Sequence, residues 1–451
     1  MRQLVHETIE EQGEPLVPAG EPVPGLVGIF SCKAPQFVPL ALARGLELGR
    51  TTHDALLDDD RLSRRHVRVE HENGRFVVTD LGSRNGTYVD GTRVQEAATF
   101  DAPRLLRIGR TLFTFVADVR PYQQGTVTTR GDMIVGPRLA DALARVARSA
   151  TLGSMLLVTG ESGSGKELAA RHFHAASPRA NGPFVAVNCA TIPVGVAERL
   201  LFGARKGAYS GATNDAEGYA QAAHGGTLFL DEIAELETGV QPKLLRLLEV
   251  GEILPLGASR PVKVDIHVVG ATLKSLRAEA AKGRFREDLY YRIGNPEVRL
   301  PPLRERLEEM PWLIRATLQK SGAALEPHPQ LVEACALRVW PGNVRELSHE
   351  LRQAAENALA AGRTVVEAGD LDPSAGLALA DESESGPQNS SKPSDERIAE
   401  VLRREHGNVS AAARALGMHR TQLRRWLARR GGYPQAVATD GADGHVTIDT
   451  E

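Results

Sequence analysis

Long apolar runs are missing from this sequence, and so is any cysteine pattern. No apolar stretch approaches the roughly 20 residues of a membrane-spanning helix, and residues 1–7 lack the apolar core of a secretory signal. The three cysteines, Cys32, Cys189 and Cys335, are odd in number, far apart and never in a Cys-x-x-Cys pair. This pattern favours free thiols in a reducing compartment over a disulfide framework or a zinc site. We therefore expect a cytoplasmic protein without membrane contact.

An excess of charge of one sign is also lacking, because 54 basic residues nearly balance 57 acidic ones. The resulting net charge of −3 does not by itself indicate a partner. Aromatic residues are sparse at 5%, but the 42% hydrophobic content is ordinary for a globular protein. This content excludes a chain that is disordered throughout. At roughly 150 residues per domain, the 451 residues predict about three domains.

Four segments have the composition of connecting or terminal chain. Residues 1–25 form an acidic, proline-rich leader, and residues 431–451 form an acidic tail. We expect both to be disordered, because they offer too little apolar surface to bury. Residues 119–133 and residues 373–395 are polar and are predicted to be linkers.

The segments between them predict a multidomain protein of three fold classes. Residues 26–118 show short strand patterns between turn signals such as Asn73-Gly74, which is typical of an all-β sandwich. In residues 134–302, apolar strands alternate with helical stretches, which predicts an α/β domain with a parallel sheet. Residues 303–372 are helical only, and residues 396–430 are helical and basic.

The α/β segment contains two phosphate-handling motifs. Gly160–Lys166 fits the Gly-x-x-x-x-Gly-Lys phosphate loop between a strand and a helix, where backbone N–H groups and the lysine cradle phosphate oxygens. The general pattern has Ser or Thr next, but Glu167 follows here. A later apolar strand ends in Asp231, predicted to hold Mg²⁺, and Glu232, predicted to orient or activate the attacking water. A glycine-rich turn that binds nothing and a capping carboxylate pair are the alternatives.

These motifs belong to a longer stretch, about Ile134 to Asp372, that resembles the AAA+ domain of bacterial enhancer-binding proteins, the activators of sigma-54 RNA polymerase. Glu167 is that family's usual residue after the lysine. The resemblance implies ATP hydrolysis by an α/β subdomain with a helical lid at residues 303–372. Six segments carry it: Gly160–Glu167, Phe184–Ala190, Gly225–Glu232, Gly283–Arg292, Leu300–Arg306 and Trp340–Leu347.

The resemblance implies roles for further residues. Asn188 would be the switch that holds Glu232 inactive, and Arg345 the lid residue that senses nucleotide. Arg286 and Arg292 would be arginine fingers that reach a neighbouring subunit's ATP, which requires a closed ring such as a hexamer. Surface salt bridging is the alternative for these arginines. The implied ATP-binding residues are Gly160, Glu161, Ser162, Gly163, Ser164, Gly165, Lys166, Glu167, Thr272 and Arg345.

One residue departs from the family pattern in a way that bears on catalysis. After Ala271-Thr272, the family usually has a polar residue that reads the γ-phosphate, and this chain has Leu273. The leucine side chain cannot form a hydrogen bond. Either Thr272 carries the role or nucleotide sensing is altered, and we expect ATP hydrolysis to survive.

The segment Gly207-Ala-Tyr-Ser-Gly-Ala212 is similar to the family's Gly-Ala-Phe-Thr-Gly-Ala signature, which contacts sigma-54. Small residues let a loop tip flex, and Tyr209 offers an aromatic surface. Ser210 keeps the hydroxyl of the usual threonine. An ordinary glycine-rich surface loop is the alternative. The implied sigma-54 contacts are Gly207, Ala208, Tyr209, Ser210, Gly211 and Ala212.

The β-rich segment resembles a forkhead-associated (FHA) domain, a reader of phosphothreonine peptides. Its signature runs through Gly49-Arg50, Ser63-x-x-His66 and Asn85-Gly86. Arg50 offers a charged fork to phosphate, Ser63 a hydroxyl and Arg64 a second cation. Asn85 would fix the peptide backbone. Ser83, in the same loop as Asn85, is a further candidate for phosphothreonine binding.

His66 is expected to be structural, packing and hydrogen-bonding the binding loops. A sandwich used only for dimer contacts is the alternative for the whole domain. Enhancer-binding proteins often carry a phosphoacceptor receiver at this end, so a phosphate reader here suggests regulation like that of two-component systems. The ligand would be a phosphorylated partner, a kinase or a segment of this chain, for which Thr126–Thr129 is one candidate.

Residues 396–430 carry a net charge of +6 and resemble the Fis-type helix-turn-helix that ends most enhancer-binding proteins. Gly417 separates two helical stretches, and Leu423, Trp426 and Leu427 would face inward. Arginine can pair with guanine and glutamine with adenine. A solvated basic hairpin is the alternative. The predicted DNA-binding residues are His419, Arg420, Thr421, Gln422, Arg424 and Arg425.

Together these observations predict a sigma-54-dependent transcription activator. Its expected cofactors are ATP and Mg²⁺. Its expected partners are sigma-54 RNA polymerase, upstream activating DNA, a phosphothreonine-containing protein or kinase, and further copies of the chain. The alternative is a phosphothreonine-dependent DNA-binding regulator or adaptor that does not act through sigma-54. The departures from the family pattern at Leu273 and Ser210 favour this alternative.

Overall fold

The computed structural model describes residues 21–42, 45–51, 59–322, 324–378 and 395–404. The chain divides into two compact units, Met1–Ala378 and Leu379–Glu451. In the second unit the described residues form one helix, α12 (Asp395–Arg404), which buries Ile398 and Leu402, one turn apart. The predicted DNA-binding residues and the tail lie outside the described residues, as do residues 379–394 of the predicted linker.

The N-terminal sandwich consists of two sheets whose facing residues form its core. The predicted hairpin is confirmed, since β4 and β5 pair through Glu72 and Arg75 and the turn residues Asn73 and Gly74 have φ near +51° and +79°. The strand orders are β2-β1-β10-β9-β6-β7 and β3-β4-β5-β8. Their bounds are β1 Gly25–Ser31, β2 Ala34–Ala41, β3 Leu46–Leu48, β4 Val67–Glu72, β5 Arg75–Asp80, β6 Thr87–Val89, β7 Thr92–Val94, β8 Ala97–Phe100, β9 Leu105–Ile108 and β10 Thr111–Val116.

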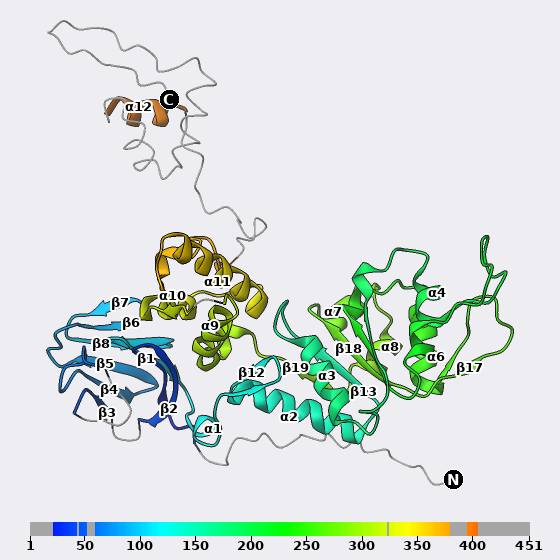
Figure 1. Ribbon diagram of the computed structural model, residues 1–451, viewed down its shortest axis with the longest axis horizontal. Helices are drawn as coiled ribbons and strands as arrows, with labels where there is room; N and C mark the ends of the chain where they lie inside the picture. Colours follow the sequence, from blue (N-terminus) through cyan, green and yellow to red (C-terminus); the bar gives the residue numbers. More distant parts are fainter. Residues whose placement is uncertain (1–20, 43–44, 52–58, 323, 379–394, 405–451) are drawn as a thin grey trace, which may run out of the picture. The chain divides into compact units, whose positions relative to one another are not determined.

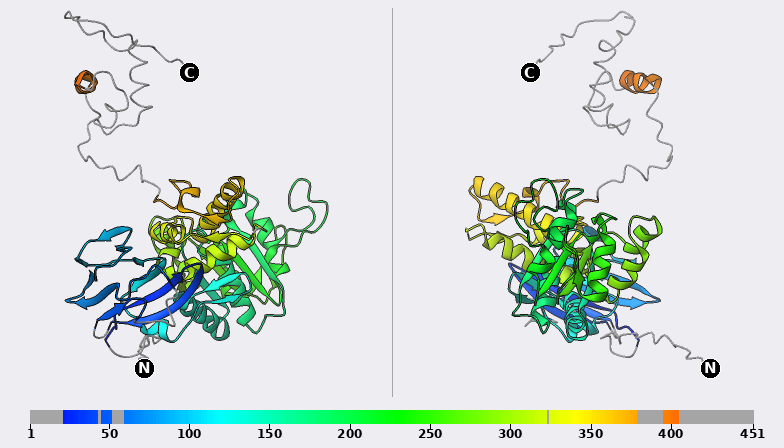
Figure 2. Two further views of the ribbon diagram at one scale, coloured as in Figure 1. Left: turned by 60° about the vertical axis from the view of Figure 1, so that its left-hand side comes forward. Right: turned by 90° about the vertical axis from the view of Figure 1, so that its right-hand side faces the viewer.

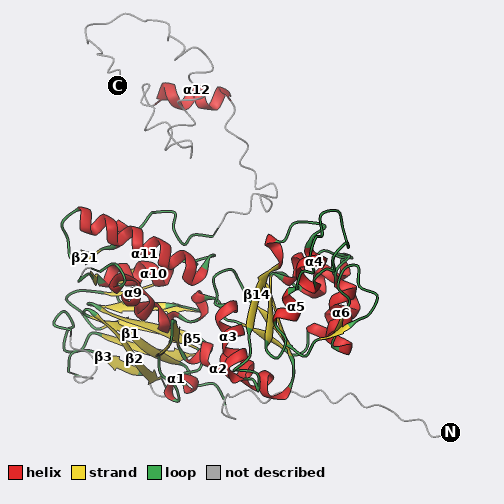
Figure 3. Cartoon of the chain, turned by 45° about the vertical axis from the view of Figure 1, so that its right-hand side comes forward, coloured by secondary structure: helices red, strands yellow, loops and turns green. Residues whose placement is uncertain are grey.

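The central domain is the predicted parallel α/β layer structure. Its sheet has the order β14-β15-β18-β13-β19, and every pair is parallel. Figure 3 shows α3 on one side of this sheet and α5 and α6 on the other. Along β15, Leu228 and Leu230 face one core and Phe229 the other, so the strand is apolar on both faces. The strand bounds are β13 Met155–Thr159, β14 Phe184–Asn188, β15 Thr227–Asp231, β18 His267–Thr272 and β19 Glu297–Arg299.

Helices cover both faces of the sheet and form the lid that follows it. The domain's helices are α2 Pro137–Leu152, α3 Lys166–Ala176, α4 Ala197–Phe202, α5 Tyr219–Ala222, α6 Gln241–Val250, α7 Leu276–Ala281 and α8 Glu287–Ile293. The lid contains α9 Met310–Gln319, α10 Pro329–Leu337 and α11 Asn343–Ala360, with the short strands β20 Glu326–Pro327 and β21 Val365–Val366. Trp340 is fully buried in the lid, and its indole donates a 2.7 Å hydrogen bond to the Cys335 carbonyl. Among the described residues, no helix is long and apolar enough to cross a bilayer.

The segment predicted as a linker at 119–133 is folded. It forms α1 (Arg120–Gln123) and the hairpin of β11 (Thr128–Arg130) with β12 (Met133–Val135). Val119 and Tyr122 are buried, because they pack into a core that the polar composition of the segment did not reveal. The second small hairpin, of β16 (Glu252–Ile253) with β17 (Val262–Lys263), lies in the α/β domain.

The sandwich and the lid share one hydrophobic core. Val27 of β1 and Leu112 of β10 belong to the same buried cluster as Ile314 of α9 and Leu331 of α10. The lid helices α9 and α10 lie against the sandwich in Figures 1 and 2. A shared core of this kind makes the two parts one structural unit, because separating them exposes apolar surface to water.

Two arginines of the sandwich add polar contacts to this interface. The guanidinium of Arg104 donates hydrogen bonds of 3.0 Å each to the carbonyls of Ala336 and Leu337. These carbonyls at the C-terminal end of α10 have no hydrogen-bond donor within the helix, so Arg104 satisfies them. Arg107 forms a 2.7 Å ion pair with Glu333, with both side chains at most 15% exposed, and stacks 3.9 Å above the ring of Tyr88. These bonds fix the register of the sandwich on the lid.

We predict that Arg107 and Glu333 stabilise the interface as a pair. Alanine at both positions, compared with each single substitution, should give a coupling free energy of about 1–3 kcal/mol, because breaking a desolvated pair leaves a charge without its partner. The measurement is urea unfolding followed by tryptophan fluorescence. The matched control is the exposed pair Arg75–Asp101 of the same sandwich, for which no measurable coupling is expected. Equal coupling in the two cycles would contradict this prediction.

Candidate functional site

The phosphate loop lies in the predicted position, between β13 and α3. Gly163 and Gly165 have φ values of +69° and +107°, a backbone region that favours glycine. The Lys166 ammonium, with 8% of its side chain exposed, donates to the carbonyl of Gly160 at 3.0 Å. It also lies 3.4 Å from the Glu232 carboxylate. The loop therefore presents its lysine next to the acids of the second motif.

Asp231 and Glu232 stand at the carboxyl end of β15, where parallel sheets bind ligands. Burial and the neighbouring Glu232 carboxylate raise the pKa of Asp231, and Lys166 partly opposes this shift. Glu232 has a left-handed backbone with φ of +48°, a strained state that often marks functional residues. Its carboxylate accepts a 3.2 Å hydrogen bond from the backbone N–H of Leu273.

A cavity of about 860 Å³ lies between the phosphate loop and the lid. Its volume suits a nucleotide. Apolar residues, among them Ile134 and Leu313, line it together with the charged groups. Of the predicted residues, it brings together Ser162, Gly163, Ser164, Gly165, Lys166, Glu167, Asn188, Asp231, Glu232 and Arg345.

The chemistry of the cavity fits ATP with Mg²⁺. The Ser164 hydroxyl is buried in the phosphate loop with no hydrogen-bond partner, an arrangement that a phosphate oxygen would satisfy. Two adjacent carboxylates, one with a raised pKa, are the kind of site that a divalent cation stabilises. In the described chain no group of three or more His, Cys, Asp or Glu side chains could hold a metal by itself.

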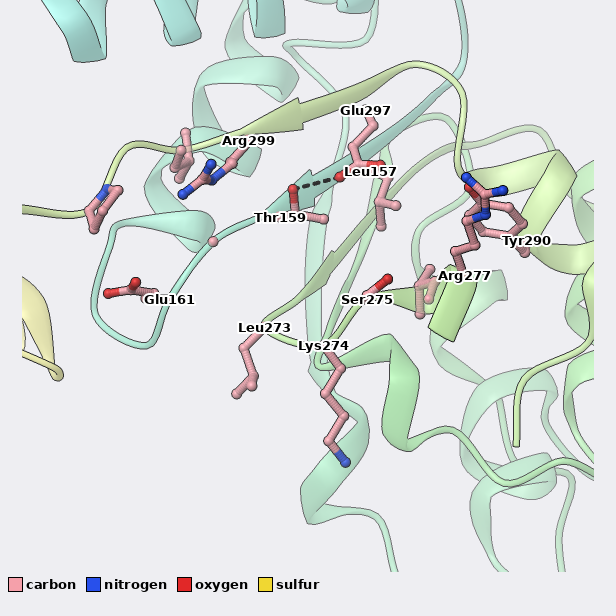
Figure 4. A pocket seen from close by; sticks show the side chains of 14 residues that line it. Leu157, Thr159, Glu161, Leu273, Lys274, Ser275, Arg277, Tyr290, Glu297 and Arg299 are labelled. Carbon is pink, nitrogen blue, oxygen red and sulfur yellow. Dashed lines mark hydrogen bonds between the residues drawn. The ribbon is translucent and has the colours of Figure 1, made fainter. Parts of the chain in front are cut away.

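Five predicted residues lie outside this cavity. The Thr272 side chain is fully buried, and its hydroxyl accepts from the Lys274 N–H within a turn, so the structure does not direct it to the phosphates. Arg286 pairs with Asp288 of its own helix at 2.7 Å, and Arg292 donates to the Leu248 carbonyl. Gly160 and Glu161 line a smaller cavity, for which Figure 4 labels Glu161 among the lining residues.

The predicted switch residue, Asn188, lines the large cavity beside Asp231, its register partner on the adjacent strand. Its side-chain oxygen accepts a 3.0 Å hydrogen bond from the Ala190 N–H, which caps a turn. In this state Glu232 is held by Lys166 and Leu273 instead.

Sequence reasoning missed several residues that the lid contributes to the cavity. Arg306, Glu309, His349 and Arg352 line it, all from the lid segment. Arg306 lies in one of the segments that carry the family resemblance, but no spacing rule indicated which way its side chain points. One of its guanidinium nitrogens donates a 3.0 Å hydrogen bond to the Ser164 carbonyl, which lies 142 positions away in the sequence.

The predicted sigma-54 loop follows α4 and extends away from the parallel sheet (Figure 1). Tyr209 at its tip is 40% exposed. The hydroxyl of this tyrosine accepts a 2.9 Å hydrogen bond from Arg199 of α4, and the same guanidinium lies over the ring. At the base of the loop, the Asp215 carboxylate holds Arg205 and the Lys206 N–H.

The predicted phosphothreonine site brings three loops of the sandwich together. Arg50 is exposed, and its N–H donates to the Ser63 carbonyl at 2.9 Å. The Ser63 hydroxyl accepts from the Arg84 N–H, while the Asn85 amide donates to the Arg61 carbonyl at 2.6 Å. The Ser83 hydroxyl donates to Asp80 at 2.6 Å, so it supports the loop from within.

The structural role predicted for His66 is confirmed. Its ring is fully buried, one ring nitrogen accepts from the Ser63 N–H, and the other contacts the Gly86 carbonyl at 3.2 Å. Burial lowers the pKa of His66, which favours the neutral imidazole that such a pair of bonds requires. One histidine thus joins two of the three binding loops.

Three family models match the chain in the predicted order. They are the FHA domain at residues 46–112, the Sigma-54 interaction domain at residues 134–299 and the Bacterial regulatory protein, Fis family, at residues 395–429. These matches confirm the three predicted fold classes, which are an N-terminal FHA sandwich, an α/β AAA+ domain and a C-terminal helix-turn-helix region.

Relatives and solved structures agree with these matches. The chain is 44% identical to the Nif-specific regulatory protein of Herbaspirillum seropedicae, over 48% of this chain and 42% of that protein. It is 38% identical to the DNA-binding transcriptional regulator NtrC of Escherichia coli (strain K12), over 65% of this chain and 69% of that protein. A crystal structure of NtrX from Brucella abortus in complex with ATP matches 67% of this chain and 70% of that chain, with 31% identity and a TM-score of 0.51.

The chain spans less than half the length of some of these relatives, the Nif-specific regulators among them. With NtrC of Escherichia coli, however, the similarity extends over more than two thirds of the relative's length. The chain therefore belongs to the family of sigma-54-dependent transcriptional regulators that includes NtrC.

Proposed function

We propose that this chain is an ATP-hydrolysing transcription activator that remodels sigma-54 RNA polymerase under the control of phosphothreonine recognition. The observation that carries the proposal is the convergence of Lys166, Asp231, Glu232 and Arg345 on one cavity of nucleotide size. Each residue suits one task of phosphoryl transfer, which consists of positioning and of electrostatic stabilisation.

The roles follow from where the side chains lie. The loop N–H groups and Lys166 bind the phosphates, and Glu232 orients and activates the attacking water. Mg²⁺, held by Asp231, supplies charge neutralisation across the phosphates when bound. To activate water, Glu232 must first break its contacts with Lys166 and the Leu273 N–H. Asn188 is the register partner of Asp231, the residue before Glu232, and it takes part in this exchange of contacts. Arg286 and Arg292 lie outside their own cavity, which suits fingers offered to a neighbouring subunit in a ring.

The remaining parts connect ATP hydrolysis to transcription. The exposed loop Gly207–Ala212 contacts sigma-54, with Tyr209 as its aromatic anchor. The Fis-type segment at residues 395–429 binds upstream DNA. The FHA domain binds a phosphothreonine peptide through Arg50, Ser63, Arg64 and Asn85, and its shared core with the lid carries the effect to the ATP site.

The internal segment Thr126–Thr129 is a constrained candidate ligand. Thr128 and Thr129 belong to β11 and pair with Val135 and Ile134 of β12. A phosphorylated threonine there could reach the FHA loops only after this hairpin opened. Thr126 precedes β11 and is exposed, so within this segment it is the threonine that the hairpin does not restrain, and an external phosphothreonine protein or kinase is the other candidate ligand.

We predict that hydrolysis depends on Glu232 and not on the Leu273 side chain. Glu232→Gln should lower kcat for ATP by roughly 100-fold or more, since it removes the group that activates water. Leu273→Ala should stay within about threefold of the parent chain, because this side chain is 56% exposed and only its backbone N–H bonds Glu232. Phosphate release, measured over a range of protein concentrations, tests both. Undiminished hydrolysis by Glu232→Gln would reject the proposed site.

We predict that Tyr209 serves the polymerase and not the ATP site. Tyr209→Ala should abolish ATP-dependent transcription by sigma-54 RNA polymerase in vitro while leaving hydrolysis unchanged. Tyr209→Phe is the matched control, because it keeps the ring and removes only the hydrogen bond to Arg199. A parent chain that hydrolyses ATP without activating transcription would instead support the adaptor function.

We predict that Arg50 provides the affinity of the FHA domain for phosphate. Arg50→Ala should weaken binding to a phosphothreonine peptide library by roughly 10- to 100-fold, because a hydrogen-bonded charge pair is lost. The control is Arg75→Ala, an exposed arginine of the same sandwich that pairs with Asp101 outside the binding loops. The measurement is binding of the library and of its unphosphorylated counterpart. Equal effects of the two substitutions would argue against phosphothreonine recognition at this site.

A further inference from the structure

The phosphate loop and the lid meet at the level of their backbones. A Cβ atom at Gly163 would lie 2.2 Å from the Gly342 carbonyl oxygen and 3.0 Å from the Cβ of Arg345. The left-handed φ of Gly163 also disfavours a side chain at this position. The phosphate loop can therefore approach the lid backbone this closely only because residue 163 is glycine.

Asn343 occupies the centre of this contact. It is fully buried and has a left-handed backbone with φ of +50°, which asparagine tolerates better than most residues. Its side-chain NH₂ donates to the Ser162 carbonyl at 3.0 Å and to the Glu161 carboxylate at 3.1 Å. Its side-chain oxygen accepts from the Leu303 N–H at 2.7 Å. This one amide thus joins the phosphate loop to two parts of the lid.

Glu161 forms the second half of the link. Its two carboxylate oxygens accept from the two terminal nitrogens of Arg304 at 2.6 and 2.8 Å, a bidentate ion pair. This guanidinium lowers the pKa of Glu161, so the carboxylate stays charged at neutral pH. The negatively charged Glu161 carboxylate is already paired with Arg304 and would be repelled by a triphosphate, so we expect no direct contact between Glu161 and ATP. Figure 4 labels Glu161 among the residues that line the smaller cavity.

We propose that Glu161 and Asn343 are positioning residues that lock the lid to the phosphate loop, so that Arg345 and the loop N–H groups face the same phosphates. Arg345 lies at the end of this chain of contacts, 3.3 Å from the Ser162 hydroxyl. A loop and lid fixed in advance bind ATP without an ordering cost at the moment of binding. The proposal rests on the proposed ATP site, and it replaces a direct contact of Glu161 with ATP by an indirect one.

The experiment measures ATP affinity and turnover in the full chain. Glu161→Ala and Arg304→Ala should each weaken binding of a fluorescent ATP analogue, and raise KM, roughly tenfold, since each breaks a charge-assisted pair. The value of kcat should stay within about threefold, because the groups that activate water are untouched. Asn343→Gly, which permits the left-handed backbone but removes the amide, should have the same effect on KM.

The double variant Glu161→Ala with Arg304→Ala is the decisive one. Because the two side chains act as one pair, it should weaken ATP affinity no more than Glu161→Ala alone does. Arg75→Ala, on the sandwich surface, is the control with no expected effect on ATP. Affinities equal to the parent in both single variants would overturn the proposal, and so would single-variant losses that add in the double variant. A parent chain that binds no ATP would instead reject the proposed function.

Discussion

A buried guanidinium, that of Arg306, holds together the three segments on which the site depends. It donates to the Ser164 carbonyl in the phosphate loop and pairs with Glu309 at 3.0 Å, and the same carboxylate accepts from the Gly136 N–H ahead of α2. Both charged side chains are nearly inaccessible. Removing one partner of such a pair costs about 3–5 kcal/mol, because the other charge is left buried without compensation. Separating the phosphate loop, the lid and the start of the α/β domain at this point would therefore cost a large free energy.

Burial around this pair also decides which neighbouring acids carry charge. Desolvation and the negative charge of Glu309 raise the pKa of Glu308 to about 8, so that Glu308 is protonated at neutral pH. Desolvation raises the pKa of Glu309 to about 7, against the opposing effect of Arg306. Glu309 is the acid whose carboxylate contacts Arg306 and the Gly136 N–H, so negative charge is better stabilised on Glu309 than on Glu308. The same lid segment continues into α9, whose Ile314 packs against the sandwich, so the charge network and the FHA interface share one element.

Local patterns were sufficient to predict the parts of the fold and site that depend on neighbours in sequence. The Asn73-Gly74 hairpin, the phosphate loop at Gly160–Lys166 and the strand that ends in Asp231 follow from turn chemistry and strand patterning within a few residues. The interface of Arg107 with Glu333 joins positions 226 residues apart, and no periodicity indicates such a pair. Tyr122 lies in a segment whose polar composition predicts a linker, because a single aromatic residue is too weak a signal to reveal a core contact. The role of the Glu161 side chain was likewise hidden, since its partner Arg304 lies 143 residues away.

Leu273 contacts Glu232 through its backbone, although its side chain cannot form a hydrogen bond. A leucine at the position that usually reads the γ-phosphate removes a side-chain donor, but its N–H donates to Glu232 with the geometry that β18 imposes. A backbone donor fixed by a strand end does not vary with the residue type, provided that it is not proline. Thr272 is fully buried, and its hydroxyl bonds within its own turn. Of Thr272 and Leu273, it is therefore Leu273 that connects the end of β18 to Glu232, through its backbone N–H. The substitution therefore changes what can contact the phosphate directly, while the coupling of the strand to Glu232 is retained.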